Sequence, residues 1–171
     1  MKLTTLEEYG LRCVLQMVKK GEGSSSTIPE LARLEALTVP NTAKLMRLLR
    51  QAGVVRSQRG SQGGYVLARS AGEISVQEVL DAVGGHFDLD RICSRQGGDR
   101  ASCIHRGDCS MESLWGVLGG LLSGVLSRCM LSDLADPVRM RRWVSTRVEP
   151  ALVASRESPD VFKSLKEGAR G

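Results

Sequence analysis

Two short helical patterns followed at once by a glycine-rich hairpin constrain the fold of this chain more than any other feature. Residues 27–34 begin with the capping-box sequence Thr-Ile-Pro-Glu, which predicts the start of a helix. After a short turn, residues 38–52 predict a second helix with leucines on one face. Residues 54–58 and 65–68 are typical of strands, and the tip 59–64 between them holds glycines that permit positive φ angles. A helix-turn-helix followed by a two-stranded wing is a winged helix, so we predict a mainly α fold with a small β-wing.

The second of these helices and the hairpin tip carry polar and basic side chains that suit DNA. From Ala36 to Gly72 the chain has no Asp or Glu, but it has 6 Lys or Arg residues. Such a block favours a polyanion-binding surface, although a merely solvated face and a hairpin without a ligand have the same composition. In a winged helix the second helix of the motif enters the major groove, and a basic wing tip reaches the narrow minor groove. The contacts predicted from this pattern are Asn41, Thr42, Lys44, Arg47, Arg59 and Gln62.

Three of the 5 cysteines lie in one polar, glycine-rich stretch, at Cys93, Cys103 and Cys109. Nine residues separate the first two and five separate the last two. Loops that gather thiolates in this way hold soft metals or iron–sulfur clusters. The other two cysteines, Cys13 and Cys129, fall in apolar helical patterns, where we expect packed thiols.

A long apolar helical pattern follows the third cysteine, from about Ser110 to about Met130. Gly116, Gly120 and Gly124 recur along it every fourth residue, and each glycine costs a helix about 1 kcal/mol relative to alanine. Close approach of the same helix from a second chain would compensate, so we predict a dimerisation helix; a kinked helix is the alternative.

The predicted organisation has four parts. Residues 1–84 form the winged-helix domain, 85–110 the cysteine-rich loop, 111–148 the dimerisation helix with a short basic helix around Trp143, and 149–171 a mobile tail. No secretory signal or membrane-spanning stretch is visible, so we expect a cytoplasmic protein in which thiols stay reduced.

The chain resembles the bacterial IscR/NsrR-type transcription regulators, which are dimeric winged-helix proteins that often carry iron–sulfur clusters. The likeness covers about residues 1–135 and rests on Leu3-Thr with Glu8-Tyr-Gly-Leu-Arg12, on Gly53-Val-Val, and on Arg59-Gly-x2-Gly-Gly-Tyr-x-Leu67. It implies a recognition helix from about Pro40 to Arg47, which adds Thr38 and Pro40 to the predicted DNA contacts, with Arg59 in the minor groove of a DNA operator. It also implies a homodimer whose cluster is held by the three cysteines of the loop.

The fourth ligand and the cluster type stay open. Some relatives use an acid in the first helix of the partner subunit, which matches Glu8 here, and Arg12 one turn later can hold that carboxylate. Other relatives use a histidine where this chain has Glu112, and His105 in the loop is a third candidate. Relatives commonly place the first two cysteines closer together than here. A 4Fe–4S and a 2Fe–2S cluster are both compatible with the ligand set, because either can be held by three cysteines and one other ligand.

The predicted function is a DNA-binding transcription regulator, specifically a repressor, whose cluster senses nitric oxide, redox state or iron–sulfur supply. One alternative keeps the winged helix but replaces the cluster with zinc bound by three cysteines and His105, or with thiol oxidation. Another is an iron–sulfur carrier or partner-binding module that does not bind DNA. With 2 histidines, no phosphate loop and no nucleophile–base pair, the sequence does not indicate an enzyme.

Overall fold

The computed structural model describes residues 4–60, 63–84 and 110–150 of the 171-residue chain. These residues divide into two compact units, which are described separately. The first contains the described residues up to Gly84 together with Ser127–Val144, and the second contains Ser110–Leu126 and residues 145–150.

Three helices of the first unit begin with a capping box, a hydroxyl residue followed three positions later by a glutamate, and the box at Thr27 is the one described above. They are α1 (Thr5–Lys20), α2 (Ile28–Leu34) and α4 (Val76–Ala82). In each, a hydroxyl before the helix accepts a backbone N–H of the first turn, and a glutamate three residues later accepts the N–H of the capping residue. The caps fix where these helices start.

The helix α3 (Val39–Gln51) begins immediately after the turn that follows α2. Thr38 caps it by accepting the N–H of Asn41 at 3.4 Å. The turn contains Ala36, whose φ of 53° lies in the left-handed region that favours glycine. At the other end of α3, Gly53 takes a φ of 73° and turns the chain into the hairpin.

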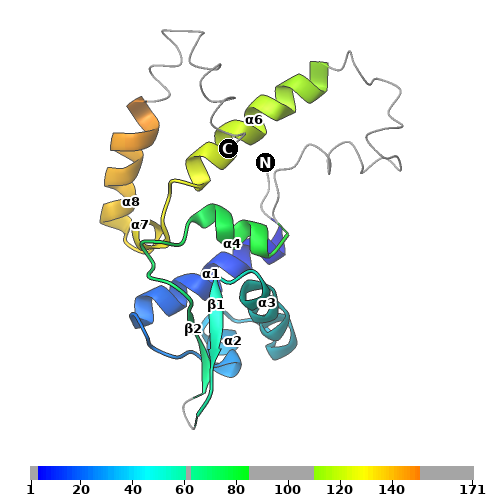
Figure 1. Cartoon of the computed structure of the whole chain (residues 1–171), viewed down its shortest axis with the longest axis vertical. Helices are drawn as coiled ribbons and strands as arrows, with labels where there is room; N and C mark the ends of the chain where they lie inside the picture. Colours follow the sequence, from blue (N-terminus) through cyan, green and yellow to red (C-terminus); the bar gives the residue numbers. More distant parts are fainter. Residues whose placement is uncertain (1–3, 61–62, 85–109, 151–171) are drawn as a thin grey trace, which may run out of the picture. The chain divides into compact units, whose positions relative to one another are not determined.

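The wing consists of β1 (Val55–Gln58) and β2 (Gly64–Leu67), which pair antiparallel from Val55 opposite Leu67 to Gln58 opposite Gly64. The hairpin projects from the helices of the first unit (Figure 1). Ser26, just before α2, forms a further antiparallel bridge with Tyr65. A Cβ on Gly64 would lie only 2.6 Å from the carbonyl oxygen of Ser26, so this close approach requires glycine. The bridge attaches the wing to the start of the helix-turn-helix, and the predicted winged helix is confirmed.

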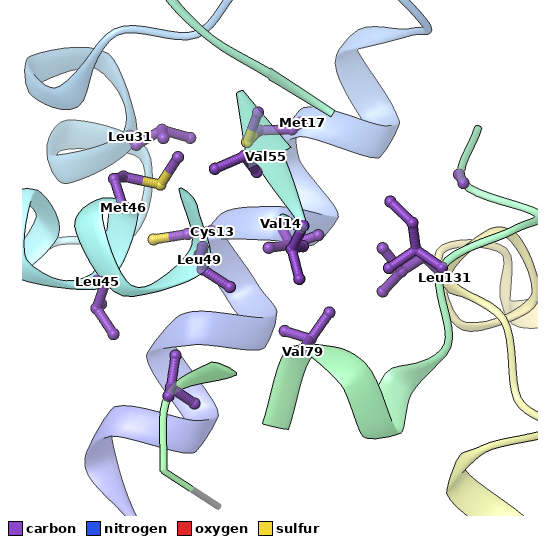
Figure 2. Packing of buried hydrophobic residues seen from close by; sticks show 14 residues of the cluster. Cys13, Val14, Met17, Leu31, Leu45, Met46, Leu49, Val55, Val79 and Leu131 are labelled. Atoms are coloured by element: carbon purple, nitrogen blue, oxygen red, sulfur yellow. The ribbon is translucent and has the colours of Figure 1, made fainter. Parts of the chain in front are cut away.

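The core of the first unit lies between α1, α3, α4 and the wing (Figure 2). Cys13, Val14 and Met17 of α1 belong to one cluster with Leu45, Met46 and Leu49 of α3. The same cluster includes Leu31 of α2, Val55 of β1, Val79 of α4 and Leu131. Cys13 is fully buried, which confirms it as a packed thiol. The burial raises its pKa to about 11.

The segment after residue 126 belongs with the winged helix, which differs from the predicted division of the chain. Leu131 begins α7 (Leu131–Leu134), and its N–H donates to the carbonyl of Ile74 at 2.9 Å. The basic helix α8 (Pro137–Trp143) follows, capped by Asp136, and Trp143 is buried. Thus the short basic helix exists as predicted, but α7 and α8 pack as part of the first unit.

The apolar helix α6 (Ser110–Leu126) forms as predicted but ends four residues before Met130. Residues 127–128 form a turn, and Met130 pairs in a β-bridge with Ser75, so a helix extended to Met130 was wrong. Cys129 is off the helix yet buried, as expected of a packed thiol. Leu114, Leu118 and Val125 are exposed on one face of α6. After α8 the chain continues as a π-helical turn (Val144–Val148), and none of the described helices is long and apolar enough to cross a membrane.

Candidate nucleic-acid interface

The exposed side of α3 is the clearest candidate surface for DNA. One stripe of α3 is buried and consists of Thr42, Leu45, Met46 and Leu49. With 3.6 residues per turn, the opposite side presents Pro40, Lys44 and Arg47, and all three are exposed. Thr38 and Asn41 are also exposed, at the start of the helix. These five predicted contacts therefore share the accessible part of α3.

Thr42 does not belong to this surface. Its side chain is fully buried, and its hydroxyl donates to the carbonyl oxygen of Thr38 at 3.1 Å. The prediction of Thr42 as a DNA contact was therefore wrong. The threonine is polar in the sequence, but its hydroxyl is satisfied by the preceding turn and its methyl group lies in the core.

The wing adds a second group of cations. Arg59 is exposed directly after β1, and Arg56 is exposed on β1 itself. Gln62, the other predicted contact at the tip, lies outside the described residues.

The six cations between Ala36 and Gly72 do not all have the same role. Arg69 donates to Glu78 of α4 and to the backbone carbonyl of Glu73, so it fastens the hairpin to α4. Within the described part of the chain, none of the other five cations of the block forms an ion pair. They are Lys44, Arg47, Arg50, Arg56 and Arg59, and all are exposed. These cations give α3 and the wing a positive potential that favours phosphates.

A buried carboxylate next to the helix-turn-helix turn was not recognised in the sequence. Glu35, the C-cap residue of α2, is only 6% exposed. Its oxygens accept from Arg12 Nε at 2.5 Å and from Gln16 Nε2 at 2.6 Å, both on α1. The partners lie 23 and 19 residues away, so no local pattern indicates the contact.

Arg12 connects this buried carboxylate to the predicted cluster ligand. Its Nη1 lies 3.4 Å from Glu8 Oε1, which is the i,i+4 pair that the sequence suggests. The hydrogen bond and charge of Glu35 are the larger cause of the raised pKa of Arg12, and Glu8 contributes less. Arg12 also lies over the ring of Tyr9, 5.5 Å from its centroid. Arg12 thus links Glu8 of α1 to Glu35 in the turn before α3.

The predicted metal ligands are only partly within the described residues. Glu8 is accessible, with 54% of its side chain exposed. Cys93, Cys103, Cys109 and His105 lie outside the described residues, and Glu112 lies on α6 without a described side chain. Among the residues that are described, no group of three His, Cys, Asp or Glu side chains converges on a possible metal position. The donor set proposed for a cluster therefore rests on the sequence.

A winged helix with cations on its second motif helix and on its wing is the architecture of DNA-binding transcription regulators, and this is the class that the fold defines. The family model of Rrf2, described as an iron-dependent transcriptional regulator, matches residues 3–137. The chain belongs to the Rrf2 family. This confirms the family resemblance seen in the sequence and the expectation of a regulator rather than an enzyme.

Individual relatives agree with this assignment. The HTH-type transcriptional regulator IscR of Cronobacter sakazakii is 30% identical over 136 residues, which cover 80% of this chain and 81% of that protein. The structure of CymR (YrzC), the global cysteine regulator of B. subtilis, matches with a TM-score of 0.63 and 25% identity, covering 79% of this chain and 96% of that one. The oxidised form of Staphylococcus aureus CymR matches with a TM-score of 0.61 and 28% identity, over 80% of this chain and 97% of that one.

Proposed function

We propose that this protein is a cytoplasmic, homodimeric repressor that binds an operator through α3 and the wing, and whose affinity is set by an iron–sulfur cluster. The observation that carries the DNA-binding part is the group of exposed cations on α3 and the wing, which form no ion pair with the described part of the chain. Thr38, Pro40, Asn41, Lys44 and Arg47 contact the major groove, and Arg59 with Gln62 contacts the minor groove.

The exposed face of α6 supports the dimer. Leu114, Leu118 and Val125 are between 37% and 52% exposed and fall on one side of the helix. Gly120 and Gly124 lie on another side, where an added Cβ would have no neighbour within 4 Å. A second copy of α6 would bury such apolar surface, and a dimer would place two recognition helices about 34 Å apart, one helical turn of DNA.

The cluster ligands are Cys93, Cys103 and Cys109 of one subunit with Glu8 of the partner subunit. Thiolates suit iron–sulfur clusters, and the carboxylate of Glu8, although paired with Arg12, is exposed and accessible to another chain. When bound, such a cluster supplies a centre that responds to nitric oxide, redox state or iron–sulfur supply. Glu112 and His105 remain the alternatives for the fourth position.

The contacts of Arg12 suggest how ligand exchange at Glu8 affects DNA binding. Arg12 holds Glu8 and the buried Glu35 at the same time. When Glu8 leaves Arg12 for the cluster site, Arg12 is held by Glu35 alone, next to the turn that positions α3. We therefore expect the state of Glu8 to alter the orientation of α3 relative to α1.

The test combines a spectrum with a DNA titration. Anaerobically purified protein is expected to be brown, with iron and sulfide in stoichiometric amounts, and Glu8→Gln is expected to change the visible spectrum. Arg59→Ala is expected to weaken operator binding, whereas Arg141→Ala, an exposed arginine on α8, serves as the matched control. Colourless protein that stays colourless after reconstitution contradicts the cluster, and equal DNA affinity of the two arginine variants contradicts the role of the wing.

Thiol oxidation without a cluster is the second candidate. It is favoured by the similarity to S. aureus CymR, whose structure is known in an oxidised form. In that case DNA affinity should respond to peroxide and be restored by a thiol reductant, in protein free of iron. Zinc bound by the three cysteines and His105 predicts instead a colourless protein with one zinc per chain.

A further inference from the structure

The first turn of α3 presents apolar surface where a recognition helix meets DNA. Val39 is the first residue of α3 and is 49% exposed, and it is not part of the core cluster. Pro40 beside it is exposed, and Ala43, one turn later, is partly exposed. None of these side chains offers a hydrogen-bond donor or acceptor.

The charge pattern separates α3 from the helices around it. The first turns of α1, α2 and α4 each contain a glutamate, which the positive end of a helix favours. The first turn of α3 contains no acid. An acid at this position would repel the phosphates of a nearby duplex, so its absence suits a helix that enters the groove with its N-terminal end.

Helical geometry places Val39 on the same flank as a cation. Val39, Ala43 and Arg47 follow one another at intervals of four residues, to one side of the buried stripe. Arg47 lies eight positions after Val39, which corresponds to about 12 Å along the helix axis. This distance is about three to four base-pair steps at 3.4 Å each.

The chemistry of the major groove indicates what such a flank recognises. Thymine presents a C5 methyl group there, and apolar side chains contact it, whereas arginine binds the O6 and N7 atoms of guanine. Thr42 adds no polar contact here, because its side chain is fully buried and its hydroxyl donates to the carbonyl oxygen of Thr38. We propose that Val39 and Ala43 read a thymine methyl group within about four base pairs of the guanine contacted by Arg47. This inference rests on the proposed DNA binding and adds a base preference to it.

The test removes the methyl group from the DNA and the side chain from the protein in turn. A preferred duplex is first selected from random sequence with the full-length protein. Each thymine of a half-site is then replaced by deoxyuridine, which lacks only the methyl group, and affinities are measured by fluorescence anisotropy. Val39→Ala is compared with Val138→Ala, since Val138 on α8 is 64% exposed and provides the same substitution away from α3.

We expect one thymine per half-site at which deoxyuridine lowers the affinity of the wild type about fourfold, the value of one buried methyl group. Val39→Ala is expected to bind the thymine duplex more weakly and to be insensitive to this deoxyuridine, whereas Val138→Ala behaves like the wild type. Because alanine is a better helix former than valine, the Val39→Ala variant is expected to keep α3 intact, which circular dichroism checks.

The possible results distinguish a failure of the proposed methyl contact from a failure of the proposed DNA binding. If the wild type binds a selected duplex but no deoxyuridine weakens it, or if Val39→Ala keeps the full deoxyuridine effect, the methyl contact is refuted and DNA binding stands. If no duplex is selected and binding shows no salt dependence, the proposed function itself fails.

Discussion

The packing of α1 against α4 depends on the absence of a side chain at Gly10. Gly10 is buried between Glu8 and Arg12 on α1, and a Cβ built on it would lie 2.9 Å from Cγ1 of Val83 at the end of α4. Real Cβ atoms essentially never come this close to another heavy atom. Gly10→Ala therefore forces either Val83 or the whole of α4 to shift, next to the residues proposed to act on the cluster.

The expected change in the free energy of unfolding is the sum of opposing contributions. Gly10→Ala gains about 1 kcal/mol of helix propensity but costs about 1–3 kcal/mol through overpacking, so a net loss of about 1 kcal/mol is expected. Val83→Ala removes two methyl groups from a site that is 6% exposed and costs about 2 kcal/mol, cavity included. In the double variant the new methyl group occupies the space that Val83 leaves. Its stability should lie within about 1 kcal/mol of the wild type, which gives a coupling of about 2 kcal/mol.

Urea unfolding of the four proteins, followed by circular dichroism, measures this coupling through the midpoints at an unchanged m-value. Gly72→Ala is the control, because a Cβ there meets nothing closer than 3.8 Å and the substitution should be neutral or slightly stabilising. If the effects of Gly10→Ala and Val83→Ala add to within about 0.5 kcal/mol, the two residues do not compete for space and the packing described here is incorrect.

Three further predictions concern side chains that the structure accounts for. Thr42→Val should leave DNA affinity unchanged and lower the free energy of unfolding by about 1 kcal/mol. Lys44→Ala should instead weaken DNA binding and reduce its salt dependence. A loss of DNA affinity in Thr42→Val would mean that Thr42 contacts DNA after all. The thiol of Cys13, with a pKa of about 11, should resist alkylation at pH 8 in the folded protein, as mass spectrometry of labelled peptides can verify, and rapid labelling would mean that it is not buried. The hydrogen bond from Lys20 lowers the pKa of Glu30, so this pair stabilises the fold above about pH 4.3 and loses its effect as the pH falls through the lowered pKa. The free energy of unfolding, measured as a function of pH, should therefore decrease less on acidification in Lys20→Met than in the wild type. An identical decrease in the two proteins would argue against the pair.

Local sequence signals predict the parts of the fold that depend on neighbouring residues. The three capping boxes fix helix starts through hydrogen bonds over three residues, and the glycines of the wing permit a turn that few other residues allow. The end of α6 follows a different rule. The apolar pattern continues to Met130, but the backbone of Met130 pairs with Ser75, a contact that no periodicity within α6 can indicate.

In the candidate site, too, the sequence predicts some features, whereas others depend on contacts between distant residues. Lys44, Arg47 and Arg59 are exposed, as a basic block in a winged helix suggests. The residue type of Thr42 does not reveal that this side chain is buried, because its burial depends on which residues of α3 face the core. Glu35 is a single acid in a turn, and its role appears only when α1 brings Arg12 and Gln16 to it.

The central proposal is that one protein couples a cluster to operator binding, and the affinity of a single anaerobic sample before and after cluster removal tests it most directly. Iron and sulfide are quantified in both states, and the selected duplex is titrated by fluorescence anisotropy at fixed salt. We predict stoichiometric iron and sulfide in the first state and at least a tenfold difference in affinity between the two, which is about 1.4 kcal/mol. Equal affinities with and without the cluster would contradict the coupling, even if both forms bind DNA well.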